Sequence, residues 1–494
     1  MPSQEREKFA SRLGFIMVSA GCAVGLGNVW KFPYLCGQYG GAAFILIYLL
    51  CLALIATPIL ICELSVGRAS QKSSAKSFNI LEPPKTKWHI ASFMCIAGTY
   101  LLMAFYTGVC GWMLYYFFKY LIGGFAALTT PQEISDTFTG MLGSPGAMIG
   151  STVIVIIAAF SICALGVQKG VEKITKYMMC ALFLILGILA VNSVLLPNAD
   201  KGLEFYLVPN FDAIAAHGIG NVLFAAMSQA FFTLSIGIGA MAMFGSYLDK
   251  SRSLTGEAIT ISCLDTLVAI IAGLIIIPAC FSFNINPETG PSLIFITMPN
   301  VFRQMTGGQI WGALFFLFLL FAALSTVVAV FENIVAYAIE LFGFSRKKAI
   351  IINLIALIVL SMPCILGFNV LSGFEPLGTG SNILDLEDFL VTNNLLPIGA
   401  LIYLMFCTHK NGWGWNNFLA ETDSGTGMKF PVRLRFLMQY ILPFLIVIIY
   451  IKGYYDKFSS SGTVYLIIWL SVALIFLGFV GYCAFYKARS EREP

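Results

Sequence analysis

The sequence has few charged residues and no stretch polar enough to form a soluble domain. Only 11% of its 494 residues are Asp, Glu, Lys or Arg, compared with about 25% in soluble proteins. It has no CxxC pair and no Asn-x-Ser/Thr acceptor site, and its 13 cysteines are scattered. These absences exclude an ordinary soluble domain or a coiled coil and argue against a disulfide framework or a zinc site. The net charge of +4 comes with no basic, aromatic-rich patch, so we expect no nucleic-acid partner.

Apolar residues are abundant instead: 58% of the chain is hydrophobic, and the mean hydropathy is +0.85. An apolar run of about 20 residues crosses the hydrocarbon core of a bilayer as a helix. The sequence therefore predicts an all-α polytopic membrane protein with twelve transmembrane helices. The predicted spans are 12–35, 41–66, 88–122, 149–165, 174–196, 220–247, 256–283, 309–342, 347–367, 384–409, 432–454 and 462–487.

Lys and Arg concentrate in the two tails and in the connections that would share one side of the membrane. Because such residues favour the cytoplasmic side, both termini are expected there. The lack of glycosylation acceptor sites favours a bacterial inner membrane.

Two predicted spans contain clusters of glycine, at Gly21, Gly25 and Gly27 in span 1 and at Gly237 and Gly239 in span 6. Each glycine destabilises a helix by about 1 kcal/mol relative to alanine. Close packing through small residues is one interpretation. The other is a pair of helices broken at mid-membrane. Spans 1 and 6 are five apart, as expected of two five-helix inverted repeats.

This second interpretation divides the chain into five parts. They are a cytoplasmic tail (1–11), a first repeat with helices 1–5 (12–196), an extracellular loop (197–219), a second repeat with helices 6–10 (220–409), and helices 11 and 12 with a cytoplasmic C-terminal tail (410–494). Helices 11 and 12 lie outside the repeats, where they would serve bundle packing or self-association as a homodimer.

Several segments carry motifs that are specific in type and order. They are Arg12-Leu13-Gly14-Phe15, the stretch 23–34 followed by Gly40-Gly41-Ala42-Ala43-Phe44, Glu63-x-x-x-Gly67-Arg68, Tyr106 six residues before Trp112, the stretch 229–235, and Ala322-Ala323-Leu324-Ser325-Thr326. Together they resemble the neurotransmitter:sodium symporter family, in particular its bacterial amino-acid transporters. The resemblance covers nearly the whole chain. It implies sodium-coupled symport by alternating access, with no organic cofactor.

The resemblance implies a substrate site at the two breaks. The carboxylate of an amino acid would bind the amides of Leu26 and Gly27 and the Tyr106 hydroxyl. Its ammonium would bind the carbonyls of Ala23, Phe232 and Thr233 and the hydroxyl of Ser235. The pocket for the side chain would be formed by Leu102, Phe232, Ile238, Thr326 and Val330. This pocket is apolar, so we expect a neutral, hydrophobic amino acid. Gly25 is the twelfth residue of this site. Amine transporters of the family have an aspartate at its position, and the absence of that aspartate favours an amino acid over a bare amine. Plain packing is the alternative role for each aliphatic residue.

One or two sodium sites are also implied by the resemblance. The first would use Ala23, Asn28, Thr233 and a side chain from span 7, together with the substrate carboxylate. Sharing that carboxylate would couple the affinities for ion and substrate. The second would use the carbonyls of Gly21, Val24 and Ala322 and the hydroxyls of Ser325 and Thr326. The alternative for these hydroxyls is bonding to their own helix carbonyls.

Asp265 departs from the family pattern. It falls at the ligand position of span 7, where relatives have asparagine. One turn later, Ala269 replaces the serine of chloride-dependent members. An acid in an apolar helix is costly unless it has a partner. We therefore expect Asp265 to bind sodium and to supply the negative charge that chloride supplies elsewhere. The alternative is a protonated acid hydrogen-bonded within the bundle.

Two sets of residues resemble the gates of the family, each of which is built around an ion pair. The outer set is Lys31 and Asp388, with Gln229 nearby; the inner set is Arg6 and Glu340, with Tyr247 nearby. Ordinary interfacial charges are the alternative. Of the two remaining buried acids, we expect Glu63 to brace unwound backbone in span 6 and Glu332 to have a structural role.

Three other functions compete with sodium symport. A proton-coupled transporter of the same fold would use Asp265 as the proton carrier. A channel or transport-like receptor would need a pore-lining ring of charge or a signalling domain, and the sequence has neither. We do not expect an enzyme, because no metal-ligand set or nucleophile–base pair can be assigned.

Overall fold

The computed structural model describes residues 8–285, 292–459 and 462–486. The described chain is helical and has no β-strand, only an isolated bridge between Arg252 and Thr426. Ten of the described helices are long and apolar enough to cross a membrane, or up to twelve if each of two bent helix pairs counts as one span.

Each predicted span corresponds to one or more helices. Their ends lie within about four residues of those expected, except that α21 begins at Leu442, ten residues after the predicted start of span 11. The first six spans are α1 (Arg12–Ala23) with α2 (Phe32–Gln38); α3 (Ala42–Cys51) with α4 (Thr57–Ser70); α6 (Ala91–Leu121); α8 (Pro145–Ala164); α9 (Lys173–Val194); and α12 (Ile219–Thr233) with α13 (Ala240–Gly245). The last six are α14 (Leu254–Ser282); α16 (Gly308–Phe342); α17 (Arg346–Leu366); α18 (Ile383–Leu390) with α19 (Leu396–Thr408); α21 (Leu442–Phe458); and α22 (Thr463–Phe485).

The connections between spans carry shorter helices that a search for long apolar runs does not find. They are α5 (Ser74–Leu81), α7 (Pro131–Leu142), α10 (Ala199–Leu207), α11 (Phe211–His217), α15 (Met298–Gln304) and α20 (Trp415–Thr422). The segment 197–219, expected as a loop, is therefore mostly helical. Such helices depend on local signals. In α7, for example, Thr130 and Glu133 form a capping box.

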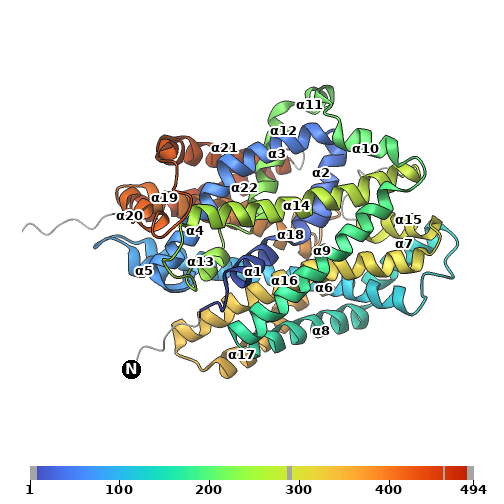
Figure 1. Cartoon of the computed structure of the whole chain (residues 1–494), viewed down its shortest axis with the longest axis horizontal. Coiled ribbons are helices and arrows are strands. Elements are labelled where there is room, and N and C mark those ends of the chain that lie inside the picture. Colours follow the sequence, from blue (N-terminus) through green and yellow to red (C-terminus); the bar gives the residue numbers. More distant parts are fainter. Residues whose placement is uncertain (1–7, 286–291, 460–461, 487–494) are drawn as a thin grey trace, which may run out of the picture.

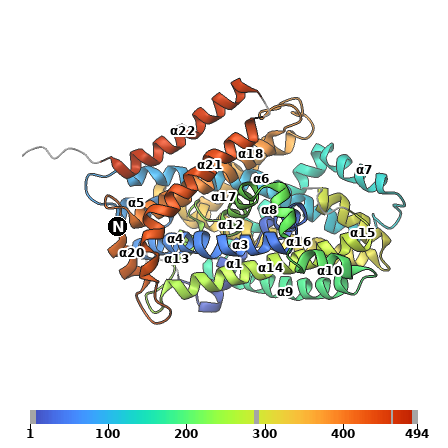
Figure 2. The same cartoon turned by 90° about the horizontal axis from the view of Figure 1, so that it is seen from above.

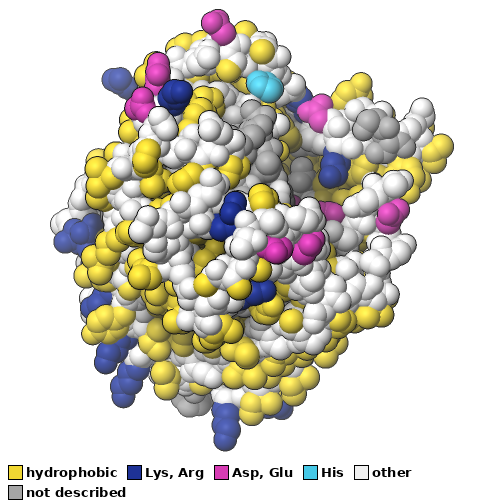
Figure 3. Space-filling view, turned by 90° about the vertical axis from the view of Figure 1, so that its right-hand side faces the viewer, with side chains coloured by type: hydrophobic (Ala, Val, Ile, Leu, Met, Phe, Trp, Pro, Cys, Tyr) yellow, Lys and Arg dark blue, Asp and Glu magenta, His cyan; other side chains and the backbone are white. Residues whose placement is uncertain are grey.

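The long helices run between two ends of the molecule (Figure 1). Helices α5 and α20 lie at one end, which we call the tail side. Helices α7, α10 and α15 lie at the other, which we call the far side, and a second view agrees (Figure 2). The far side carries acidic and basic side chains with hydrophobic ones between them (Figure 3). Helix α16 is largely buried, whereas α22 is mostly exposed, as expected of a helix that faces lipid.

Spans 1 and 6 are both interrupted. The two halves of span 1 meet at an angle of 55°, and α1 ends where Val24 takes an extended conformation. In span 6 the backbone of 234–239 is not helical, with positive φ at Ser235 (51°), Gly237 (100°) and Gly239 (80°). Glycine adopts positive φ at little cost, so the glycine cluster explains why span 6 breaks here.

Candidate functional site

A cavity lies where the broken segments of spans 1 and 6 face α6 and α16. Its lining residues are Cys22, Ala23, Gly25, Leu26, Gly27, Leu102, Tyr106, Phe232, Ser235, Ile238, Thr326 and Leu396. About 20 Å³ is accessible to the centre of a water molecule, which is room for about one water. A substrate larger than that must move the walls.

Ten of the twelve residues expected around the substrate line this cavity. The other two are Thr233, whose hydroxyl donates to Asp265 instead, and Val330, which is buried in α16 one turn beyond Thr326. Two lining residues were missed by sequence reasoning, Cys22 and Leu396. No local pattern marks Leu396, because its place depends on how span 10 packs against span 6.

Polar groups from both breaks meet at the cavity. The Leu26 amide donates to the Tyr106 hydroxyl at 3.1 Å, and the Ser235 hydroxyl donates to the Cys22 carbonyl at 3.2 Å. The carbonyl of Cys22 lies at the end of α1 and the amide of Leu26 at the start of the second half of span 1, where helix ends leave such groups without a partner in their own helix. The cavity therefore offers donors for an anionic group and acceptors for a cationic one without any charged side chain in its lining.

Gly25 has no room for a side chain. A Cβ there would lie 2.4 Å from the Tyr106 hydroxyl oxygen and 3.0 Å from Thr326 Oγ1. An aspartate at this position, as in the amine transporters, would displace Tyr106. The geometry thus gives a steric reason for the glycine.

One oxygen cluster joins span 1 to α16. The Ser325 hydroxyl donates to the carbonyls of Gly21 (2.9 Å) and Ala322 (3.0 Å). Thr326 Oγ1 lies 3.2 Å from the Gly21 carbonyl and 3.3 Å from those of Val24 and Ala322. One hydroxyl proton can serve only one of these acceptors at a time. All five residues expected for a second sodium site converge here, with more oxygens than protons, which fits a cation.

A second cluster centres on Asp265, which is fully buried in α14. Its Oδ1 accepts from Asn28 Nδ2 at 2.8 Å and its Oδ2 accepts from Thr233 Oγ1 at 2.9 Å. Asn28 Oδ1 in turn accepts the Gly25 amide at 3.1 Å. The structure thus brings together Asp265, Asn28 and Thr233, three of the four residues expected for the first sodium site. The fourth, Ala23, lines the cavity. Gly25, which lines the cavity, connects this cluster to the cavity through its bond to Asn28.

The carboxylate of Glu63 in α4 supports the break in span 6. It accepts the amides of Gly237 at 2.9 Å and Met241 at 3.2 Å. These amides would otherwise be unpaired where the helix is interrupted. The expectation that Glu63 braces the unwound backbone is confirmed.

On the far side of the cavity, Lys31 and Asp388 lie in the described chain but do not form the direct ion pair that the gate expectation suggests. Lys31 Nζ sits 4.6 Å from the centre of the Phe232 ring, an attractive cation–π geometry. Asp388 accepts from Thr392 Oγ1 within its own helix at 2.8 Å. Gln229 donates to the Gly27 carbonyl at 2.8 Å and so ties span 6 to span 1.

On the tail side, Arg6 lies outside the described residues. Its expected partner Glu340 accepts from the Ser73 amide (3.1 Å) and hydroxyl (2.6 Å). The Tyr247 hydroxyl donates to Glu332 Oε1 at 3.3 Å. Glu332 also pairs with Arg346 at 2.5 Å, so its structural role is confirmed.

The start of span 1 is held on the tail side by two acids that sequence reasoning did not single out. Glu172 accepts the amides of Ala10 (2.7 Å) and Ser11 (3.2 Å). Glu257 pairs with Arg12 at 2.9 Å. The one sequence signal for Glu172 and Glu257 is that both acids lie near the tail-side ends of predicted spans.

A multi-pass bundle with two broken helices around a central, charge-complementary cavity is the architecture of a secondary transporter. Comparisons with known proteins specify the family of transporters. A model described as "Sodium:neurotransmitter symporter family" matches residues 6–129 and 132–483. The chain therefore belongs to the sodium:neurotransmitter symporter family and is a sodium-dependent transporter, not an enzyme.

Individual relatives of the chain support this family assignment. The uncharacterized sodium-dependent transporter YhdH of Bacillus subtilis is 34% identical over 454 residues, covering 92% of this chain and 98% of its own. An uncharacterized sodium-dependent transporter of Haemophilus influenzae is 31% identical over 462 residues, covering 91% and 99%. The crystal structure of MhsT in complex with L-phenylalanine is similar with a TM-score of 0.81 at 38% identity, covering 90% of this chain and 99% of that one.

Proposed function

We propose that this protein is a sodium-coupled symporter that imports a neutral, hydrophobic amino acid by alternating access. The observation that carries the proposal is the cavity itself. Backbone groups from two broken helices face it with both polarities, and the rest of its lining is apolar except for the hydroxyls of Tyr106, Ser235 and Thr326. A zwitterion with an apolar side chain matches this arrangement. The similar MhsT structure holds L-phenylalanine, a ligand of that class.

Sodium would bind at one or both oxygen clusters. The cluster of Ser325 and Thr326 offers neutral oxygens, and the cluster of Asp265 adds a full negative charge. Because Gly25 connects the Asp265 cluster to the cavity, an ion there would be adjacent to the substrate carboxylate. Each would then raise the affinity of the other.

We further propose that transport needs no chloride. Asp265 places a carboxylate where relatives have asparagine, so an ion at this cluster already has a fixed counter-charge. Ala269, one turn along α14, offers no hydroxyl for a chloride ion. A protonated Asp265 acting as the proton carrier is the competing mechanism.

The tail side would face the cytoplasm of a bacterial cell, because Lys and Arg concentrate there. With both termini inside, repeats over 12–196 and 220–409 would insert with opposite orientations around the cavity. The exposed, apolar α22 is the surface we propose for self-association as a homodimer.

The test is uptake of radiolabelled neutral amino acids into proteoliposomes, with and without an inward sodium gradient, in chloride and in gluconate. We expect sodium-driven uptake of a hydrophobic amino acid that is equal in both anions. Sodium-driven uptake that requires chloride would refute the role of Asp265 but leave symport intact. Sodium-free, pH-dependent uptake would instead select proton coupling. Binding without flux would indicate a receptor.

A further inference from the structure

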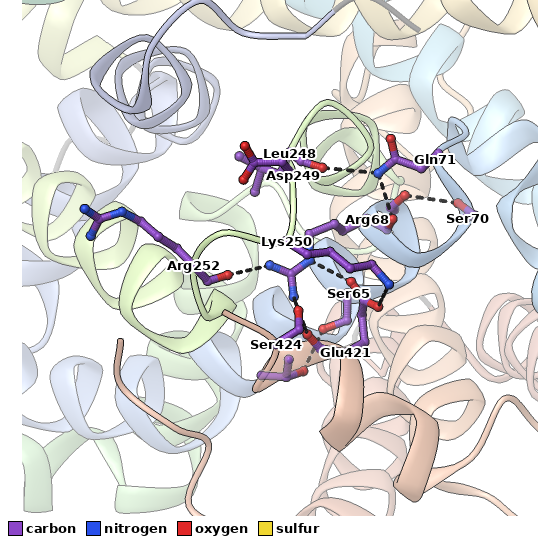
Figure 4. Close-up of polar contacts among 12 residues, drawn as sticks. Ser65, Arg68, Ser70, Gln71, Leu248, Asp249, Lys250, Arg252, Glu421 and Ser424 are labelled. Carbon is purple, nitrogen blue, oxygen red and sulfur yellow. Dashed lines mark hydrogen bonds and ion pairs between the residues drawn. The ribbon is translucent and has the colours of Figure 1, made fainter. Parts of the chain in front are cut away.

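Arg68 is a charged residue that the transport site does not use, and it is only 1% exposed. It lies in the last turn of α4 on the tail side, and Figure 4 shows its guanidinium surrounded by partners from two other segments. Nε donates to Glu421 Oε1 at 2.7 Å, and NH1 donates to the Arg252 carbonyl at 2.6 Å. NH2 donates to Ser424 Oγ at 2.7 Å and to the Glu421 carbonyl. One side chain therefore joins span 2, the loop after span 6 and the connection between spans 10 and 11.

The connection between spans 10 and 11 is attached at further points. We call its residues 415–428, which comprise α20 and the turn after it, the strap. The Thr426 amide donates to the Ser251 carbonyl at 2.9 Å, and the Ser253 amide donates to the Thr426 carbonyl at 3.0 Å. The Ser253 hydroxyl donates to the Met428 carbonyl at 2.6 Å. The strap thus pairs with the loop 248–253 through backbone as well as through Arg68.

Glu421 is the second charge of this network and is 7% exposed. Its Oε1 binds Arg68, and its Oε2 binds Lys250 at 2.9 Å. The Lys250 side chain is 63% exposed, so water weakens that pair. The buried pair with Arg68 is different, because removing one partner leaves a buried charge uncompensated.

The loop held by the strap is a wall of a tail-side cavity. About 210 Å³ of this cavity is accessible to the centre of a water molecule. Arg68, Leu248 and Arg252 line it on one side, and Phe9 and Arg12 from the start of span 1 line it on the other. Asp249, also in the lining, is held within the loop by the Ser251 hydroxyl and amide, which lower the pKa of its carboxyl. The start of span 1 therefore faces, across this cavity, a wall that is attached to the strap.

Spans 2 and 6, which carry Arg68 and the loop 248–253, are packed together as one unit. A Cβ on Gly67 would lie 1.8 Å from the Ala242 carbonyl oxygen, and one on Gly245 would lie 2.4 Å from the Leu64 carbonyl oxygen. Backbones this close cannot slide past one another without separating. Tyr247, at the end of this unit, also packs its ring 5.5 Å from that of Phe9.

We propose that the strap, locked by Arg68 and Glu421, is a positioning element of the tail-side gate, by which we mean Tyr247 and the loop 248–253 on one side of the cavity and the start of span 1 on the other. By fixing the loop, the strap favours the arrangement in which Phe9 packs on Tyr247. Arg68 and Glu421 lie outside the central cavity and outside both oxygen clusters. They act through the loop, and they connect spans 10 and 11 to the gate. The inference builds on the proposed alternating-access transport.

The first test is hydrogen–deuterium exchange of purified full-length protein in sodium buffer, comparing wild type with Glu421→Gln. Because the substitution removes the charge from a buried hydrogen bond, we expect exchange of peptides from residues 8–15 and 247–253 to rise by about tenfold. Lys250→Gln is the matched control. It removes the exposed partner of the same carboxylate and should change these peptides by less than about twofold.

The proposal is overturned if faster exchange is confined to residues 415–428, or if Lys250→Gln has the same effect as Glu421→Gln. Should Glu421→Gln fail to fold, Arg68→Lys serves instead. It keeps the positive charge and loses the fork that reaches Arg252 and Ser424. An unchanged exchange at residues 8–15 in that variant also overturns the proposal.

Uptake into proteoliposomes separates this inference from the transport proposal. If the gate opens more readily, the sodium concentration for half-maximal uptake should rise several-fold in Glu421→Gln, whereas a merely structural defect would lower the amount of active protein only. Wild-type protein without sodium-driven uptake would refute symport, and the exchange experiment would still decide the role of the strap.

Discussion

The substitution Asp265→Asn tests the centre of the proposed mechanism. In the structure the two carboxylate oxygens accept separate hydrogen bonds, from Asn28 at 2.8 Å and from Thr233 at 2.9 Å. An amide at this position keeps the shape but loses the charge. It also turns one acceptor into a donor. Thr233 can rotate its hydroxyl to accept from that donor, whereas the Asn28 amide nitrogen cannot.

The size of the effect follows from the lost attraction between the ion and the carboxylate. Two opposite unit charges about 4 Å apart attract by about 4 kcal/mol at an effective dielectric constant of about 20. A neutral amide oxygen keeps the dipolar part of that attraction, so we take the loss as about 2 kcal/mol. That corresponds to roughly a 30-fold weaker affinity for sodium. We therefore expect the sodium concentration for half-maximal uptake to rise by about that factor in gluconate. Adding Ala269→Ser should restore part of the activity in chloride only.

The assay is sodium-titrated uptake into proteoliposomes in the two anions. Glu387→Gln is the matched control, because Glu387 is a buried acid of span 10 that touches neither oxygen cluster. It should leave the sodium dependence unchanged. Full transport by Asp265→Asn in gluconate, at the wild-type sodium dependence, would refute the role of the carboxylate.

Three further substitutions test the packing of the site. Gly25→Ala should weaken substrate binding in equilibrium dialysis by at least about tenfold, because its Cβ would lie 2.4 Å from the Tyr106 hydroxyl; unaltered affinity would contradict the cavity geometry. Ser325→Ala should raise the sodium requirement of uptake by about tenfold through loss of one ligand oxygen, and an unchanged requirement would exclude this cluster as a sodium site. Gly67→Ala should lower the melting temperature by several degrees, because its Cβ would lie 1.8 Å from the span 6 backbone. Gly256→Ala is the control, because a Cβ at Gly256 would meet nothing within 4 Å, and it should leave the melting temperature unchanged. Equal melting temperatures for the two variants would argue against close packing of spans 2 and 6.

The candidate site was largely accessible from the sequence, but by two different routes. The glycine clusters and the isolated Asp265 stand out in their own spans and indicate unusual backbone and chemistry. The assignment of Ser325 and Thr326 to a sodium site depended on resemblance to a family. Their convergence on the carbonyls of Gly21 and Val24 is visible only in the structure.

The short helices and the gates were harder to predict. Lys31 and Asp388 have opposite charges and were expected to pair, yet each has a nearer partner, in Phe232 and Thr392. Attraction between charges in a sequence does not reveal which competing contact is closer. Leu396 and Cys22 were missed because an ordinary apolar residue in an apolar span carries no signal.

The sequence by itself determined the number, length and class of the transmembrane helices, because crossing a bilayer requires a local run of apolar residues. It also determined where two of them break, since glycine acts on its own backbone. Only the tertiary structure decided which distant groups meet. The bond between Arg68 and Glu421 joins residues 353 positions apart, and no local pattern specifies it. Such contacts arise from the packing of whole helices, and so the attachment of the strap to the loop 248–253 became visible only in the folded protein.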